Sequence, residues 1–167
     1  SYFHDMDAGW TRFIFDSYHI PYIVVRTGEF EQTDFSKNYD MVVFPNEDES
    51  ILKQGKRKAD EKTYMISRYP PEFTKGIGDK GMENLMAFIE KGGIIISWGR
   101  STKLFMETLK IPLADDKKEE FQLPVRDLSK DIQKAGFYCP GSLMRAKLTM
   151  NHPLTLGMKE EIGLFYT

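Results

Sequence analysis

Apolar residues along the chain recur first at helical spacing and then in short unbroken runs. The first set lies three or four positions apart, as on one face of an α-helix: Trp10, Phe13, Ile14 and Tyr18. Asp7 stands where an N-cap is expected. Runs rich in β-branched and aromatic residues then predict strands over residues 22–25 and 40–44. The second run is apolar without alternation, which favours burial on both faces of a parallel sheet.

The clearest helical pattern follows a long polar stretch and ends at Gly92, which suits a helix C-terminus. Its apolar positions are Met82, Leu85, Met86 and Ile89. Residues 94–97 predict a third strand. Ser101 or Thr102 is expected to cap a helix that carries Leu104, Phe105 and Leu109. We expect the three strands to be parallel neighbours in one sheet, with helices on both faces.

Two polar stretches separate these elements from each other and from the end of the chain. Residues 46–79 are predicted to be irregular, and residues 110–134 resemble an insertion with one short helix and a solvated charge run at 115–120. Partial alternation over 143–150 predicts another strand, and a further strand begins at Gly163. Helices alternate with strands and no internal repeat is visible, so the sequence predicts a single α/β domain over all 167 residues.

Composition narrows the classes of function. With 41% hydrophobic and 29% charged residues, the 167-residue chain has the balance of a globular domain. Its net charge of -2 offers no electrostatic footprint for nucleic acid. No apolar run approaches the roughly 20 residues of a membrane span. The one cysteine, Cys139, excludes an internal disulfide and a multi-cysteine zinc cluster. Its neighbours Tyr138 and Pro140 supply no base, which favours a structural thiol over a nucleophile.

The most informative stretch covers residues 91–102, where a helix ends at two glycines and a strand leads directly into another helix. In α/β enzymes such a strand-to-helix turn often displays the nucleophile. The turn here consists of Trp98, Gly99, Arg100 and Ser101. It contains no cysteine, and Ser101 is better interpreted as a helix cap. The pattern therefore predicts the architecture of a nucleophile turn without its chemistry.

The same turn defines a candidate ligand-binding cleft at the carboxyl end of the sheet, formed by Asn46, Trp98, Gly99, Arg100 and Ser101. In this hypothesis Arg100 pairs with a carboxylate or phosphate. Trp98 stacks on a ring or sugar. The alternative is that Trp98 packs under the following loop and Arg100 is a surface charge.

Two acidic groups are also weighed as metal sites. His4, Asp5 and Asp7 precede the first helix, where polar residues more often serve as caps. An acidic cluster follows the strand at 40–44 and is either a cation site or, as we favour, a solvated loop: Glu47, Asp48, Glu49 and Ser50.

Several sequence blocks together resemble a known family. The blocks cover residues 5–12 (D-M-D-A-G-W-T-R), 39–45, 76–81, 92–93, 139–143 (C-P-G-S-L) and 151–158 (N-H-P-L-T-L-G-M). They resemble the class I glutamine amidotransferase-like domain that forms a C-terminal module in certain bacterial zinc carboxypeptidases of the carboxypeptidase A type. The double-glycine strand and the H-P-L block are also similar to trehalose-utilisation-type domains and to a domain of some β-galactosidases.

The resemblance implies a flavodoxin-like three-layer α/β/α sandwich with a mainly parallel sheet. Such domains begin with a central strand before the first helix, and most of that strand is missing here, so we expect it to lie upstream in a longer polypeptide. The resemblance further implies that the parent is a zinc metallocarboxypeptidase, periplasmic or secreted. Its zinc belongs to a separate peptidase domain, which would be the partner of this chain.

The family chemistry does not carry over to these residues. The peptidases hold zinc with a His-x-x-Glu pair, and Glu does not follow His4, His19 or His152 at that spacing. Class I amidotransferases use a cysteine in a G-x-C-x-G turn and a His-Pro-Glu motif, whereas Leu154 follows His152-Pro153 here. The expectation is a non-catalytic accessory domain without its own cofactor, used for domain packing or for recognition of a peptide or glycan. The alternative is a small-molecule-binding or hydrolytic domain that uses the cleft at the turn.

Overall fold

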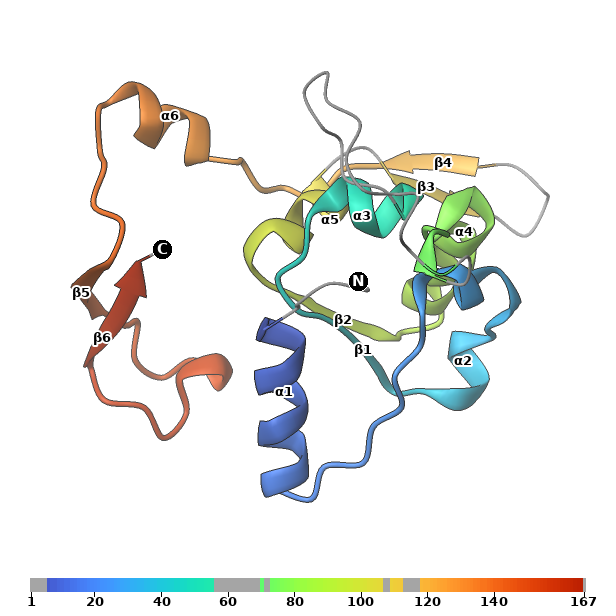
Figure 1. Cartoon of the computed structure of the whole chain (residues 1–167), viewed down its shortest axis with the longest axis horizontal. Coiled ribbons are helices and arrows are strands. Elements are labelled where there is room, and N and C mark those ends of the chain that lie inside the picture. Colours follow the sequence, from blue (N-terminus) through green and yellow to red (C-terminus); the bar gives the residue numbers. More distant parts are fainter. Residues whose placement is uncertain (1–5, 56–69, 71–72, 107–108, 113–117, 167) are drawn as a thin grey trace. The chain divides into compact units, whose positions relative to one another are not determined.

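The computed structural model describes residues 6–55, 70, 73–106, 109–112 and 118–166 (Figure 1). The chain divides into two compact units, Ser1–Val125 and Arg126–Thr167. No helix among the described residues is long and apolar enough to cross a membrane.

The first unit mixes helices with short strands. Its elements are α1 (Met6–Ser17), the 3-10 helix η1 (Thr27–Gln32), α2 (Phe35–Asn38), β1 (Met41–Phe44), α3 (Glu49–Gln54), α4 (Gly78–Glu90), β2 (Ile94–Ser97), the 3-10 helix η4 (Gly99–Thr102), α5 (Lys103–Met106), β3 (Leu109–Pro112) and β4 (Lys118–Phe121). The second unit contains α6 (Ser129–Lys134), β5 (Ser142–Lys147), the 3-10 helix η5 (Pro153–Thr155) and β6 (Glu161–Tyr166).

β1 and β2 form the parallel pair that the apolar runs predict. Their register extends from Met41 opposite Ile94 to Phe44 opposite Ser97. Parallel neighbours need a crossover connection, and α4 lies between the two strands in the chain. Gly92, with a φ of 89°, follows the end of α4, as its sequence position predicts. An α/β fold with a small parallel sheet is therefore confirmed.

One hydrophobic core lies against this sheet. Val42 and Ile95 pack on it from the two strands. Aromatic rings dominate it, with ring centroids 4.9 Å apart for Phe30 and Phe35. The buried set is Phe30, Phe35, Phe44, Leu52, Ile77, Leu85, Met86, Phe88, Leu104 and Phe105. The opposite face of the sheet carries exposed apolar residues, namely Met41, Ile94 and Ile96.

The predicted strand over residues 22–25 is wrong. The segment has no regular secondary structure, and Ile23 remains 71% exposed. A run of β-formers becomes a strand only where a neighbouring edge supplies hydrogen bonds and packing, and no strand among the described residues pairs with this segment. The prediction of three parallel neighbours is thus confirmed for two of them.

Three predictions about helix ends also need correction. α1 begins at Met6, so Asp7 lies inside its first turn and is not its N-cap. Ser101 and Thr102 lie within η4, whose N-cap residue is Trp98. Leu109 belongs to β3 and not to the helix with Leu104 and Phe105. In each case the residue occupies a different position in a helix or strand from the one that local spacing predicts.

The two polar stretches contain more regular structure than their sequence predicts. Residues 49–54 form α3, with Asp48 as N-cap. β3 and β4 pair antiparallel, from Leu109 opposite Phe121 to Pro112 opposite Lys118. The charge run at 115–120 therefore enters a strand at Lys118. Residues 115–117 lie outside the described residues. The short helix expected before residue 134 is confirmed as α6.

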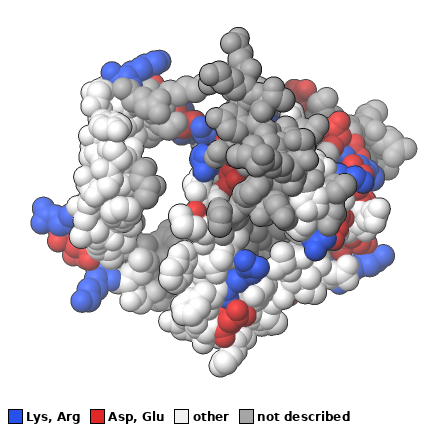
Figure 2. Space-filling view, viewed as in Figure 1, with Lys and Arg blue, Asp and Glu red and all other residues white. Residues whose placement is uncertain are grey.

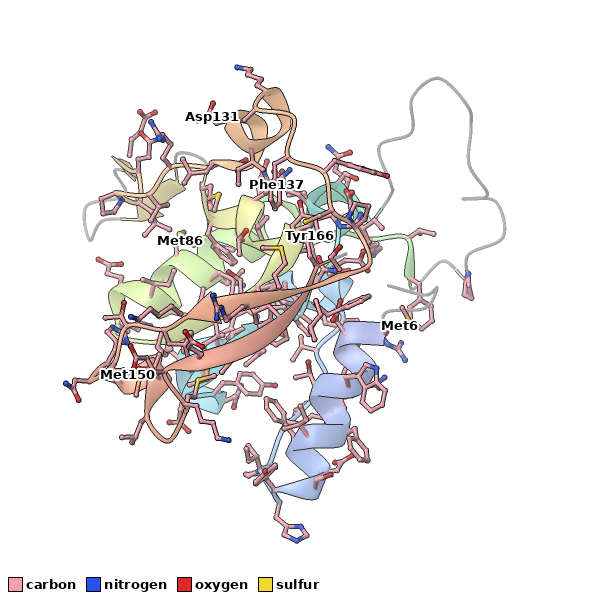
Figure 3. All side chains as sticks on the ribbon, turned by 90° about the vertical axis from the view of Figure 1, so that its left-hand side faces the viewer. Met6, Met86, Asp131, Phe137, Met150 and Tyr166 are labelled. Carbon is pink, nitrogen blue, oxygen red and sulfur yellow. The ribbon has the colours of Figure 1, made fainter. Side chains whose placement is uncertain are left out.

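In the second unit, β5 and β6 form an antiparallel hairpin from Ser142 opposite Tyr166 to Lys147 opposite Glu161. Both strands are predicted by the sequence. The rings of Phe137 and Tyr166 meet edge to face with centroids 5.8 Å apart (Figure 3).

Candidate functional site

The carboxyl ends of β1 and β2 meet at one edge of the sheet because the strands are parallel. Asn46 follows β1, and the turn Trp98–Ser101, here named the elbow turn, follows β2. The expectation that these two segments share one edge is therefore correct.

The Asn46 side chain links three elements at this edge. Its Oδ1 accepts a hydrogen bond from the backbone N–H of Arg100 at 2.8 Å. Its Nδ2 donates to Oδ2 of Asp7, in the first turn of α1, at 2.9 Å. One amide thus connects the end of β1, the elbow turn and the start of α1.

Gly99 is required by the conformation of the elbow turn and by the proximity of Asn46. Its φ is 62°, in the region that favours glycine. A Cβ at this position would lie 2.4 Å from Oδ1 and 2.6 Å from Cγ of Asn46. A larger residue would therefore disrupt the backbone turn and the Asn46 bridge together.

Ser101 is fully buried and holds the elbow turn against β1. Its Oγ lies 2.7 Å from the carbonyl oxygen of Trp98 and 3.0 Å from that of Phe44. The single hydroxyl proton is shared between these two backbone acceptors. The residue is consequently a fastening group for the turn, which differs from both the helix cap that the sequence predicts and an exposed nucleophile.

Arg100 faces an internal carboxylate. Its Nη1 lies 3.9 Å from Oδ2 of Asp48, with the two side chains 52% and 30% exposed. Asp48 is itself fixed, because its Oδ1 accepts from the backbone N–H of Ser50 at 3.0 Å and from its hydroxyl at 2.6 Å, which caps α3. An exposed pair of this kind is worth about 0–1 kcal/mol.

The charges at this edge differ from the sequence-based expectation. Asp48 faces the guanidinium of Arg100, and the carboxylate of Asp7 accepts from the same Asn46 amide that binds the Arg100 backbone. The positive charge of Arg100 is therefore partly offset by Asp48, which weakens its attraction for a free carboxylate. η4 and α5 have only four residues each. Among the described residues on the face that Figure 2 shows, acidic and basic side chains are interspersed.

Two surface cavities are formed by residues other than the elbow turn. One, of about 580 Å³, is lined by Phe15, Asp16, His19, Ile20, Pro21, Tyr22 and Val24. The other, of about 310 Å³, is lined by Gly28, Glu31, Lys53, Gln54, Lys75, Gly76 and Gly78. Desolvation and a hydrogen bond to Asp16 raise the pKa of Tyr22 in the first.

The described residues do not fit a zinc site. No three His, Cys, Asp or Glu side chains in that part of the chain stand close enough to hold an ion. His152 instead accepts a hydrogen bond at Nδ1 from the backbone N–H of Leu154, at 3.2 Å, within the connection between β5 and β6. His4 and Asp5 lie outside the described residues. Of the acidic cluster after β1, Glu49 pairs with Lys53 at 2.7 Å.

Cys139 is half-buried in the second unit, where its Sγ lies 3.5 Å from Sδ of Met144. This contact accords with the interpretation of Cys139 as a packing residue.

Sequence reasoning missed the roles of Asp7 and Asp48 at the elbow edge. A signal exists for Asp48, because Asp two positions before Ser50 is a common capping pattern. No local signal exists for the Asp7 contact, which joins residues 39 positions apart. Comparisons of the chain with protein-family models, curated proteins and solved structures find no match.

Proposed function

We propose that this chain is a non-catalytic accessory domain of a bacterial zinc carboxypeptidase, with a flavodoxin-like three-layer fold of the class I glutamine amidotransferase type. The observation that supports it best is the elbow turn. Gly99 and Asn46 maintain the sharp strand-to-helix geometry, while the hydroxyl of Ser101 is buried between two carbonyl groups. The turn has the shape of a nucleophile site and no nucleophile.

The accessory role is supported by the side chains at the carboxyl edge of the β1–β2 sheet. The polar side chains of Asn46, Asp7 and Ser101 form internal hydrogen bonds that fix the backbone. Trp98 and Arg100 remain partly accessible. Such an edge suits contact with another domain or with a peptide or glycan. The zinc and the hydrolytic step belong to the separate peptidase domain, in the periplasm or outside the cell.

The test compares this chain with the natural polypeptide that contains it. The 167-residue chain should release neither glutamate from glutamine nor C-terminal residues from peptides, with or without added zinc. The longer polypeptide should remove C-terminal residues and lose this activity with a chelator. Glutamine hydrolysis by the chain alone that disappears in Cys139→Ala would overturn the proposal, as would a longer polypeptide with no chelator-sensitive peptidase activity.

A second candidate function is binding of a small carboxylate at the elbow turn. It is favoured by the loose 3.9 Å pairing of Arg100 with Asp48, because a ligand carboxylate could replace Asp48. Titration with acetate and with a short peptide, followed by the NMR signal of the Trp98 indole, should separate the candidates. Saturable shifts that are lost in Arg100→Gln would support binding, and unchanged signals would remove this candidate.

A further inference from the structure

We draw no further inference here: the strongest candidate, the cavity of about 310 Å³ that Lys53, Lys75 and Glu31 line beside the first residue of α4, carries no proposal because Lys53 already pairs with Glu49 at 2.7 Å and nothing in the described part of the chain shows that a ligand fills the cavity.

Discussion

The elbow turn and helix α1 are connected through the Asn46 side chain, which forms a hydrogen bond with each, and their side chains are used in opposite ways. At the elbow turn the backbone N–H of Arg100 and the hydroxyl of Ser101 have internal partners, and Ser101 is fully buried. Along α1 none of the 12 residues is buried, and Trp10 is 65% exposed. The contrast separates two requirements of a fold. Internal hydrogen bonds fix the shape of a turn, whereas an amphipathic helix is stabilised mainly by packing of its apolar stripe.

The largest expected effect uses the same substitution in both environments. Phe88→Ala on α4 removes a buried ring and should destabilise the chain by about 3–5 kcal/mol. Phe13→Ala on α1 removes an exposed ring and should cost within about 0.5 kcal/mol. Urea unfolding of the two variants measures the difference. A cost for Phe13→Ala close to that of Phe88→Ala would mean that α1 is packed in the isolated chain.

The second effect concerns the backbone of the elbow turn. Gly99→Ala places a Cβ against Asn46 at a positive φ, and we expect a loss of about 2–3 kcal/mol. Gly92→Ala is the matched control, because its φ is also positive but its Cβ would meet nothing within 4 Å. It should cost only about 1–2 kcal/mol. Equal costs would show that the Asn46 bridge contributes nothing to the folded state.

The sequence predicts those parts of this contrast that depend on local spacing. The apolar runs of β1 and β2 and the periodicity of α4 each identify an element that the structure contains. The segment at 22–25 has the same composition as a strand, but pairing depends on a neighbour that spacing cannot reveal. The α1 stripe predicts a helix correctly and says nothing of what covers it.

The candidate site likewise has features that the sequence predicts and features that it does not. Asn46 and the elbow turn can be placed at one edge because parallel strands share their carboxyl ends. The partner of Asn46 on α1 and the pairing of Arg100 with Asp48 depend on side-chain directions after folding. Ser101 shows this limit of sequence-based prediction most clearly, since the same hydroxyl can cap a helix or donate to a strand carbonyl.

The third effect tests the bond between the two regions. Asn46→Ala removes two hydrogen bonds and should cost about 1–2 kcal/mol, and Asp7→Ala removes one of them. The double variant should show a coupling energy of about 0.5–1.5 kcal/mol, because the residues are in contact. Thermal unfolding of the four proteins provides the cycle. Strict additivity would show that α1 is not tied to β1 in solution.

The smallest effect is expected at the one charge that the sequence singles out in the elbow turn. Arg100→Ala removes a half-exposed guanidinium 3.9 Å from Asp48 and should change stability by less than about 0.5 kcal/mol, with less effect at 1 M salt. Asp48→Ala should cost about 1 kcal/mol in the same assay, because it also removes the cap of α3.

The comparison becomes sharper in the longer polypeptide. If a partner domain covers the elbow turn, Arg100→Ala should lower its melting temperature or raise its peptide KM, since a shielded charge-assisted bond is worth about 1.5–3 kcal/mol. No change in either quantity would indicate that no partner domain contacts the elbow turn.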